Sequence, residues 1–239
     1  MRLKVREFRI RTGPHAYRIV QPWQPLRHTT VNDPVGQHWG YLLGDHEGLN
    51  ALAALFSFAA FSRHTIVHVP LRHSIPRTFF TVDPVDLVLA HRSPGLRPSA
   101  WPGLRGRLRD GTPLTVRTNE QRTAAHAADW ERERERRHER AVEWLHPAVH
   151  AGTLFLHGGR DVFSAASVAF SLAAGFGPLE KRARKGHDAL IASLTPYLAP
   201  SRAGHRTELD IGFQARPPLH RFRPPGRPAS RRPRTAASA

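Results

Sequence analysis

Four apolar segments of this sequence each end in side chains that could bind an anion or move a proton. The polar residues that follow them are Arg72 and His73; His91, Arg92 and Ser93; Arg117, Thr118 and Asn119; and His157, Gly158, Gly159, Arg160 and Asp161. Arginine offers paired donors to phosphate and carboxylate groups, and histidine exchanges protons near neutral pH. A glycine turn at the start of a helix presents free backbone N–H groups. These residues therefore predict an anion site, provided that the chain brings them together.

We expect them to meet because ligands of open α/β sheets bind beyond the carboxyl ends of the strands. The candidates are, for ligand binding, Arg92, Arg117, Asn119, Gly158, Gly159 and Arg160 and, for proton transfer, His157 and His91. Such a site suits a small phosphate- or carboxylate-bearing ligand and hydrolase- or transferase-type chemistry. A plainer explanation fits the same residues, since strands end where polar residues begin and an arginine-rich chain carries arginine in most loops.

The common catalytic and cofactor motifs are missing from the sequence. It contains no phosphate-loop G-x-x-x-x-G-K-[ST], no G-x-S-x-G and no H-E-x-x-H, and the glycines at 175 and 177 lack the third glycine of a dinucleotide fingerprint. Sixteen histidines invite a metal hypothesis. However, His64 and His68 lie about 13 Å apart along a strand, and Pro147 separates His146 from His150. The sequence predicts neither a metal site nor a cofactor.

One short string resembles a known catalytic loop. Residues 154–159 end in His-Gly-Gly and are similar to the oxyanion loop of lipase- and esterase-type α/β-hydrolases, whose glycines let backbone N–H groups face an oxyanion. Arg160 stands where a further glycine is expected, and the sequence has no serine elbow. The resemblance covers six residues and assigns no family.

Alternating strands and helices are predicted around these candidates. Residues 3–11 alternate apolar and charged side chains with one slip, and they form a hairpin with residues 16–20. The expected elements are strands at 65–69, 86–90, 113–116, 153–156 and 209–213, and helices at 45–62, 119–145, 161–174 and 179–198, with a short helix after Ser99. The sequence predicts an α/β fold with a largely parallel or mixed central sheet flanked by helices and the N-terminal hairpin at its edge.

Composition limits the environment and the partners. The chain has 239 residues, no cysteine and a formal net charge of +17. The absence of cysteine excludes disulfides, thiolate nucleophiles and iron–sulfur clusters. The first residues alternate charge with apolar side chains, and the most apolar run, 49–61, is too short to cross a membrane. We therefore expect a cytoplasmic protein without a membrane partner.

The charge suggests a second function class. Residues 216–239 contain seven arginines and no acid, and we expect them to form a disordered tail beside one α/β domain at 1–215. Together with a basic surface, that tail could bind nucleic acid without reading its sequence. Codon bias toward arginine explains the same charge. A third hypothesis is a protein-interaction module that uses the charged helix at 131–140, in which no residue is apolar. Alternatively, this helix could bridge two lobes of the protein.

Overall fold

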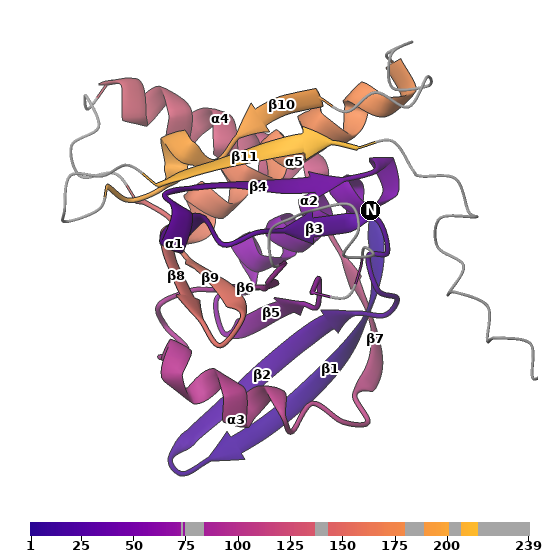
Figure 1. Ribbon diagram of the computed structural model, residues 1–239, viewed down its shortest axis with the longest axis vertical. Helices are drawn as coiled ribbons and strands as arrows, with labels where there is room; N and C mark the ends of the chain where they lie inside the picture. The colour runs from indigo at the N-terminus through magenta and orange to yellow at the C-terminus, as the bar shows by residue number, and fades with distance from the viewer. Residues whose placement is uncertain (73, 75–83, 137–142, 180–188, 201–206, 215–239) are drawn as a thin grey trace, which may run out of the picture.

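The computed structural model describes residues 1–72, 74, 84–136, 143–179, 189–200 and 207–214 (Figure 1). The predicted tail at 216–239 lies outside these ranges, as do residues 137–140 of the charged helix. The fold is mixed α/β, as the sequence predicts, with a central sheet flanked by helices.

The larger sheet has seven strands in the order β7-β1-β2-β5-β6-β9-β8. Its strands are β1 (Arg2–Thr12), β2 (His15–Pro22), β5 (Thr65–Val69), β6 (Asp86–Ala90), β7 (Thr112–Arg117), β8 (His146–His150) and β9 (Thr153–His157). Only the pairs β2·β5 and β6·β9 are parallel, and the other four neighbouring pairs are antiparallel. The sheet is therefore mixed, and its strands end at two opposite edges.

A four-stranded sheet in the order β10-β11-β4-β3 covers the other side of the helices (Figure 1). Its strands are β3 (Thr29–Val31), β4 (Trp39–Gly44), β10 (Ala189–Ser193) and β11 (Glu208–Phe213). The helices are α1 (Pro34–Gln37), α2 (His46–Phe61), α3 (Trp101–Arg105), α4 (Glu120–Arg136) and α5 (Arg160–Leu179), with short 3-10 turns at Pro98–Ala100 and Thr195–Tyr197. Helix α2 contacts β4, β5 and β6, whereas α5 contacts β10 and β11, so the two helices fill the space between the sheets.

Helix α2 is buried because its sequence is apolar on almost every side. The Asp45 side chain caps it by accepting the backbone N–H of Gly48 at 2.8 Å, as the sequence predicts. Phe56 packs against Phe163 and Phe170 of α5, with ring centroids 6.0 and 4.8 Å apart. This aromatic contact packs α5 against α2.

Strand β1 faces two different cores, which explains the slip in its alternation. Leu3 and Val5 point into the core formed with α2 and α5, whereas Phe8 and Ile10 point to the opposite face and pack under α3 with Trp101. The pairing with β2 is continuous from Val5 to Thr12, so no bulge is needed. The apolar positions change from odd to even because the covered side of the sheet changes.

The predicted elements differ from the structure at several places. Residues 189–193 form strand β10 instead of a helix, and the strands at 29–31 and 39–44 were not predicted. The described part of helix α4 runs to Arg136. Residues 146–150 pair with β9 as strand β8. The charged segment also packs on the core: the Arg134 side chain is only 11 % exposed and lies over the rings of Trp130, Trp144 and Tyr197.

Candidate functional site

The structure brings six of the eight predicted site residues to one edge of the larger sheet. Strands β6 and β9 are parallel neighbours, so their carboxyl ends lie side by side. The six residues that follow or end these strands are His91, Arg92, His157, Gly158, Gly159 and Arg160. The backbone N–H of Gly158 donates to the Ala90 carbonyl at 3.2 Å and ties the two strand ends together. We call this region, with Glu143 and His146, the β6–β9 edge.

Arg117 and Asn119 lie at the opposite edge. Strand β7 is antiparallel to β1, and β1 is antiparallel to β2. Strand β2 is parallel to β5, and β5 is antiparallel to β6. Strand β7 therefore runs opposite to β6 and β9. Asn119 begins helix α4, where its side-chain oxygen accepts the N–H of Arg122 at 2.9 Å. The predicted convergence required parallel strands, and the antiparallel β5·β6 pair prevents it.

Both proton-transfer candidates are enclosed. His91 is 9 % exposed, its Nε2 lies 2.7 Å from the Ala59 carbonyl, and its ring contacts Phe163. The His157 ring stacks on Phe155, and its Nε2 is buried without a hydrogen-bond partner among the described residues. Burial lowers the pKa of both histidines, so each stays neutral at physiological pH.

The cations of the β6–β9 edge already have contacts within the protein. The Arg92 guanidinium donates to Nε2 of His146, which lies opposite His157 in the β8·β9 pair. The Arg160 guanidinium lies over the Phe61 ring, 5.6 Å from its centroid. An arginine held over an aromatic face gains a cation–π attraction and is not free to turn without losing it.

A carboxylate of the chain occupies the start of α5, where the sequence predicted an anionic ligand. A Cβ atom at Gly159 would collide with the Glu143 carboxylate, which also accepts the backbone N–H of Asp161. Burial and the neighbouring Asp161 carboxylate raise the pKa of Glu143, partly opposed by Arg92. The sequence analysis missed Glu143 because it placed this residue within a long helix. The start of α5 is therefore in contact with a carboxyl group of the protein itself.

A second group of partnered charges lies around Asp86 at the opposite edge. Its carboxylate is 7 % exposed and accepts Nε and Nη2 of Arg72 at 3.0 and 2.9 Å and the backbone N–H groups of residues 71 and 72. Arg105 Nη1 is 3.6 Å away, and His68 Nε2, at 3.8 Å, is too far for a hydrogen bond. Burial alone would raise the pKa of Asp86, but the neighbouring His68 ring and the Arg72 donors outweigh it and hold that pKa well below its usual range.

Cations without carboxylate partners lie on one face of strands β7 and β1. Side chains alternate across a strand, so Arg2, Lys4 and Arg6 share one face of β1, about 6.6 Å apart. Arg117 lies opposite Arg2 in the register of β1 and β7. None of these four residues forms an ion pair within the described ranges, and all are exposed. Glu120, which begins the adjacent helix, is paired with the N-terminal amine at 3.3 Å.

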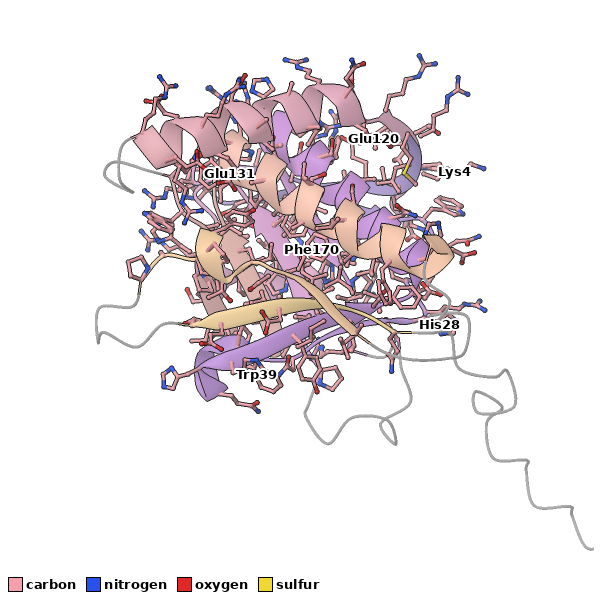
Figure 2. All side chains as sticks on the ribbon, turned by 90° about the horizontal axis from the view of Figure 1, so that it is seen from above. Lys4, His28, Trp39, Glu120, Glu131 and Phe170 are labelled. Atoms are coloured by element: carbon pink, nitrogen blue, oxygen red, sulfur yellow. The ribbon has the colours of Figure 1, made fainter. Side chains whose placement is uncertain are left out.

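An exposed aromatic ring completes this surface. Trp23 follows β2 and is 37 % exposed, and the Arg6 guanidinium lies 4.7 Å from its ring centroid. A hollow of about 380 Å³ opens beside Trp23 and is lined by Lys4, Pro113 and Thr115. Lys4 extends away from the ribbon at the margin of the molecule (Figure 2). We call Arg2, Lys4, Arg6, Arg117 and Trp23 the cationic face.

The sequence analysis identified only Arg117 of the cationic face as a site residue. The signal was present, because Arg2, Lys4 and Arg6 alternate with apolar residues. Alternation by itself indicates only that these side chains face away from the core. Their significance depends on two facts that need the fold: β7 adds Arg117 beside them, and the chain turns Trp23 onto the same face.

Comparison with known proteins identifies no relative. The chain matches no protein-family model, and no curated protein or solved structure shows significant similarity to it. Among the described residues, no three histidine, aspartate or glutamate side chains gather in a way that could hold a metal ion. No helix within the described ranges has the length and apolar character to span a bilayer. The function is therefore inferred from the β6–β9 edge and the cationic face.

Proposed function

We propose that this protein binds single-stranded nucleic acid on the cationic face, without reading its sequence. The observation that carries the proposal is the row formed by Arg2, Lys4 and Arg6 beside Trp23, with no carboxylate partner among the described residues. A cation already paired with a carboxylate gains little from a phosphate, whereas a cation without a carboxylate partner replaces the counterions of the nucleic acid when it binds.

The exposed Trp23 favours a single strand over a duplex. Proteins that bind single strands combine a basic track along the backbone with aromatic side chains on which bases stack. In a duplex the bases are already stacked on one another, so an indole ring on a flat sheet cannot reach their faces. Arg6 holds the Trp23 ring from one side, and the adjacent hollow leaves room for a base.

The salt dependence of binding tests this proposal. The affinity of the full-length protein for a single-stranded oligonucleotide would be measured at several salt concentrations. The variant Lys4→Ala/Arg6→Ala/Arg117→Ala removes three phosphate contacts and should flatten the plot of log affinity against log salt by about 2, at about 0.7 for each contact. The control Arg9→Ala/Arg11→Ala/Arg132→Ala removes the same charge elsewhere, since Arg9 and Arg11 lie on the opposite face of β1.

The control is needed because any loss of three positive charges weakens association at long range. We expect the control variant to keep the wild-type slope. Equal slopes and affinities in the two variants would refute the cationic face as the binding site. If the variant Lys4→Ala/Arg6→Ala/Arg117→Ala loses affinity for a duplex but keeps its affinity for a single strand, the assignment to single strands is overturned.

A second candidate function is the binding of a small phosphate- or carboxylate-bearing ligand at the β6–β9 edge. One observation favours it: the start of α5, with Arg92 nearby, already holds the Glu143 carboxylate. An external anion would have to displace that side chain. Phosphate should then raise the melting temperature of Glu143→Gln more than that of the wild type, and Arg160→Ala should reduce the rise. An equal rise in all three proteins would exclude this site.

A further inference from the structure

A cavity of about 820 Å³ lies between the tip of the β1–β2 hairpin and helix α3. Its walls include His15, Tyr17, Arg97, Gly103, Leu104 and Arg107. In Figure 1, α3 crosses the free end of the β1–β2 hairpin. The volume falls within the range of about 300–1,000 Å³ that small-molecule sites occupy.

The walls combine aromatic rings with positive charge. The His15 and Tyr17 rings stack with their centroids 6.0 Å apart, and the buried Leu104 adds apolar surface. Arg97 and Arg107 supply guanidinium groups, Ser99 adds a hydroxyl, and none of the lining residues is acidic. Such a lining suits a ligand that has both a flat ring and an anionic group.

One of the two arginines is held in place before any ligand arrives. Nη1 of Arg107 donates to the Arg11 carbonyl at 2.9 Å and to the Thr12 hydroxyl at 3.0 Å. A guanidinium carries five N–H donors, so these bonds orient the group and leave other donors for a ligand. Arg97 is exposed and forms no ion pair among the described residues. A preorganised arginine loses less conformational freedom on binding than a free one.

From this combination we infer that the hairpin cavity binds a nucleotide unit, with the base against His15 and Tyr17 and the phosphate at Arg97 and Arg107. The unit has two sources: a free mononucleotide, or one nucleotide of a bound strand. The inference does not depend on the cationic face, because the two sites share no residue.

Gly103 offers a way to fill the cavity without disturbing the fold. A Cβ atom at Gly103 would meet no atom within 4 Å, and its backbone is not in the left-handed region. Gly103→Trp should therefore occupy the cavity while α3 stays intact. Gly175 in α5 is a matched control, since a Cβ there also meets nothing within 4 Å and the residue does not line the cavity.

Calorimetric titration of the full-length protein with AMP tests the inference. We expect binding to the wild type and to Gly175→Trp, and a loss of about tenfold or more in Gly103→Trp, the size expected when one base loses its stacking surface. Arg97→Ala should weaken AMP more than adenosine, which has no phosphate. No heat with AMP at millimolar concentration, or equal affinity in the two tryptophan variants, would overturn the inference.

A competition experiment distinguishes the two sources. If a single-stranded oligonucleotide displaces AMP from the wild type, the cavity accepts a nucleotide of the strand; if both bind together, the site takes free nucleotide. The variant Lys4→Ala/Arg6→Ala/Arg117→Ala should bind AMP like the wild type. That result separates the two proposals, because a failure of the cationic face leaves AMP binding unchanged.

Discussion

The β6–β9 edge and the cationic face both carry positive side chains but differ in what those side chains contact. At the edge, Arg92 contacts His146 and Arg160 lies over Phe61, while Glu143 occupies the start of α5. On the cationic face, Arg2 and Lys4 have no partner among the described residues. A count of arginines therefore does not distinguish the two regions, whereas the internal contacts of those arginines do.

Removing the partner of a paired cation should have the largest effect. Asp86→Ala leaves the Arg72 guanidinium and two backbone N–H groups without their acceptor. Breaking a buried ion pair typically lowers the free energy of unfolding by about 3–5 kcal/mol, and the partial exposure of Arg72 places our expectation at the lower end. Denaturant titration measures the loss. Lys4→Ala, which removes an unpartnered cation, should stay within about 0.5 kcal/mol of the wild type.

If Asp86→Ala lowers the free energy of unfolding by less than about 1 kcal/mol, the internal contacts of Arg72 contribute little to stability, and this expected difference from Lys4→Ala is contradicted.

Trp23→Ala should have the next largest effect, on binding instead of stability. Loss of one stacking surface costs about 1–3 kcal/mol of binding free energy per base. Trp39→Ala is the matched control, because Trp39 is 43 % exposed but lies on β4 of the smaller sheet (Figure 2). Fluorescence anisotropy of a labelled oligonucleotide measures both. Equal weakening in the two variants would show that exposed indoles bind the strand wherever they lie.

Lys4→Ala alone should cause a smaller change in binding. One phosphate contact contributes about 0.7 to the salt slope for a single strand. The reduction should be the same for oligonucleotides of different sequence, because a lysine that contacts phosphate carries no sequence information. Anisotropy titrations at several salt concentrations measure it. A reduction confined to one base composition would indicate that Lys4 contacts bases.

The smallest effect concerns the charge of Glu143. Because its pKa is raised in the folded protein, ionisation of this carboxyl opposes folding. Its favourable contribution is present below the unfolded pKa of about 4.3 and is lost as the pH rises through the folded value. Glu143→Gln should therefore melt slightly higher than the wild type at pH 7 and lose this advantage below about pH 4. Melting curves across that range test the sign, and a variant that melts lower at pH 7 would contradict it.

The sequence predicted the elements whose pattern is local. The buried helix after Asp45, the strands at 65–69 and 86–90 and the N-terminal hairpin follow from periodicity and capping. Strand β10 was mistaken for a helix because four apolar residues and a serine are too short a run to show a period, and pairing with β11 decides their conformation. The slip in β1 was visible in the sequence. Its cause, two cores on opposite faces, was not.

Only part of the candidate site was predicted, again because the rest depends on contacts that are distant in the sequence. The ends of β6 and β9 converge because those strands are parallel, but the direction of β5 and β7 is a property of the whole sheet. Glu143 lies sixteen residues before Gly159, the glycine that its carboxylate contacts. Contacts of this kind decide which cations have partners, and they are long-range. Charge can be read from a sequence, but its compensation cannot.

Photochemical cross-linking of the full-length protein to a single-stranded thymine oligonucleotide, followed by mass mapping of the linked peptides, tests the central claim most directly. We predict cross-links in peptides that contain Trp23 and strands β1 and β7, and their loss at a salt concentration that abolishes binding. Cross-links confined to residues 216–239, or to α4, would contradict the account and assign the strand to another basic segment of the chain.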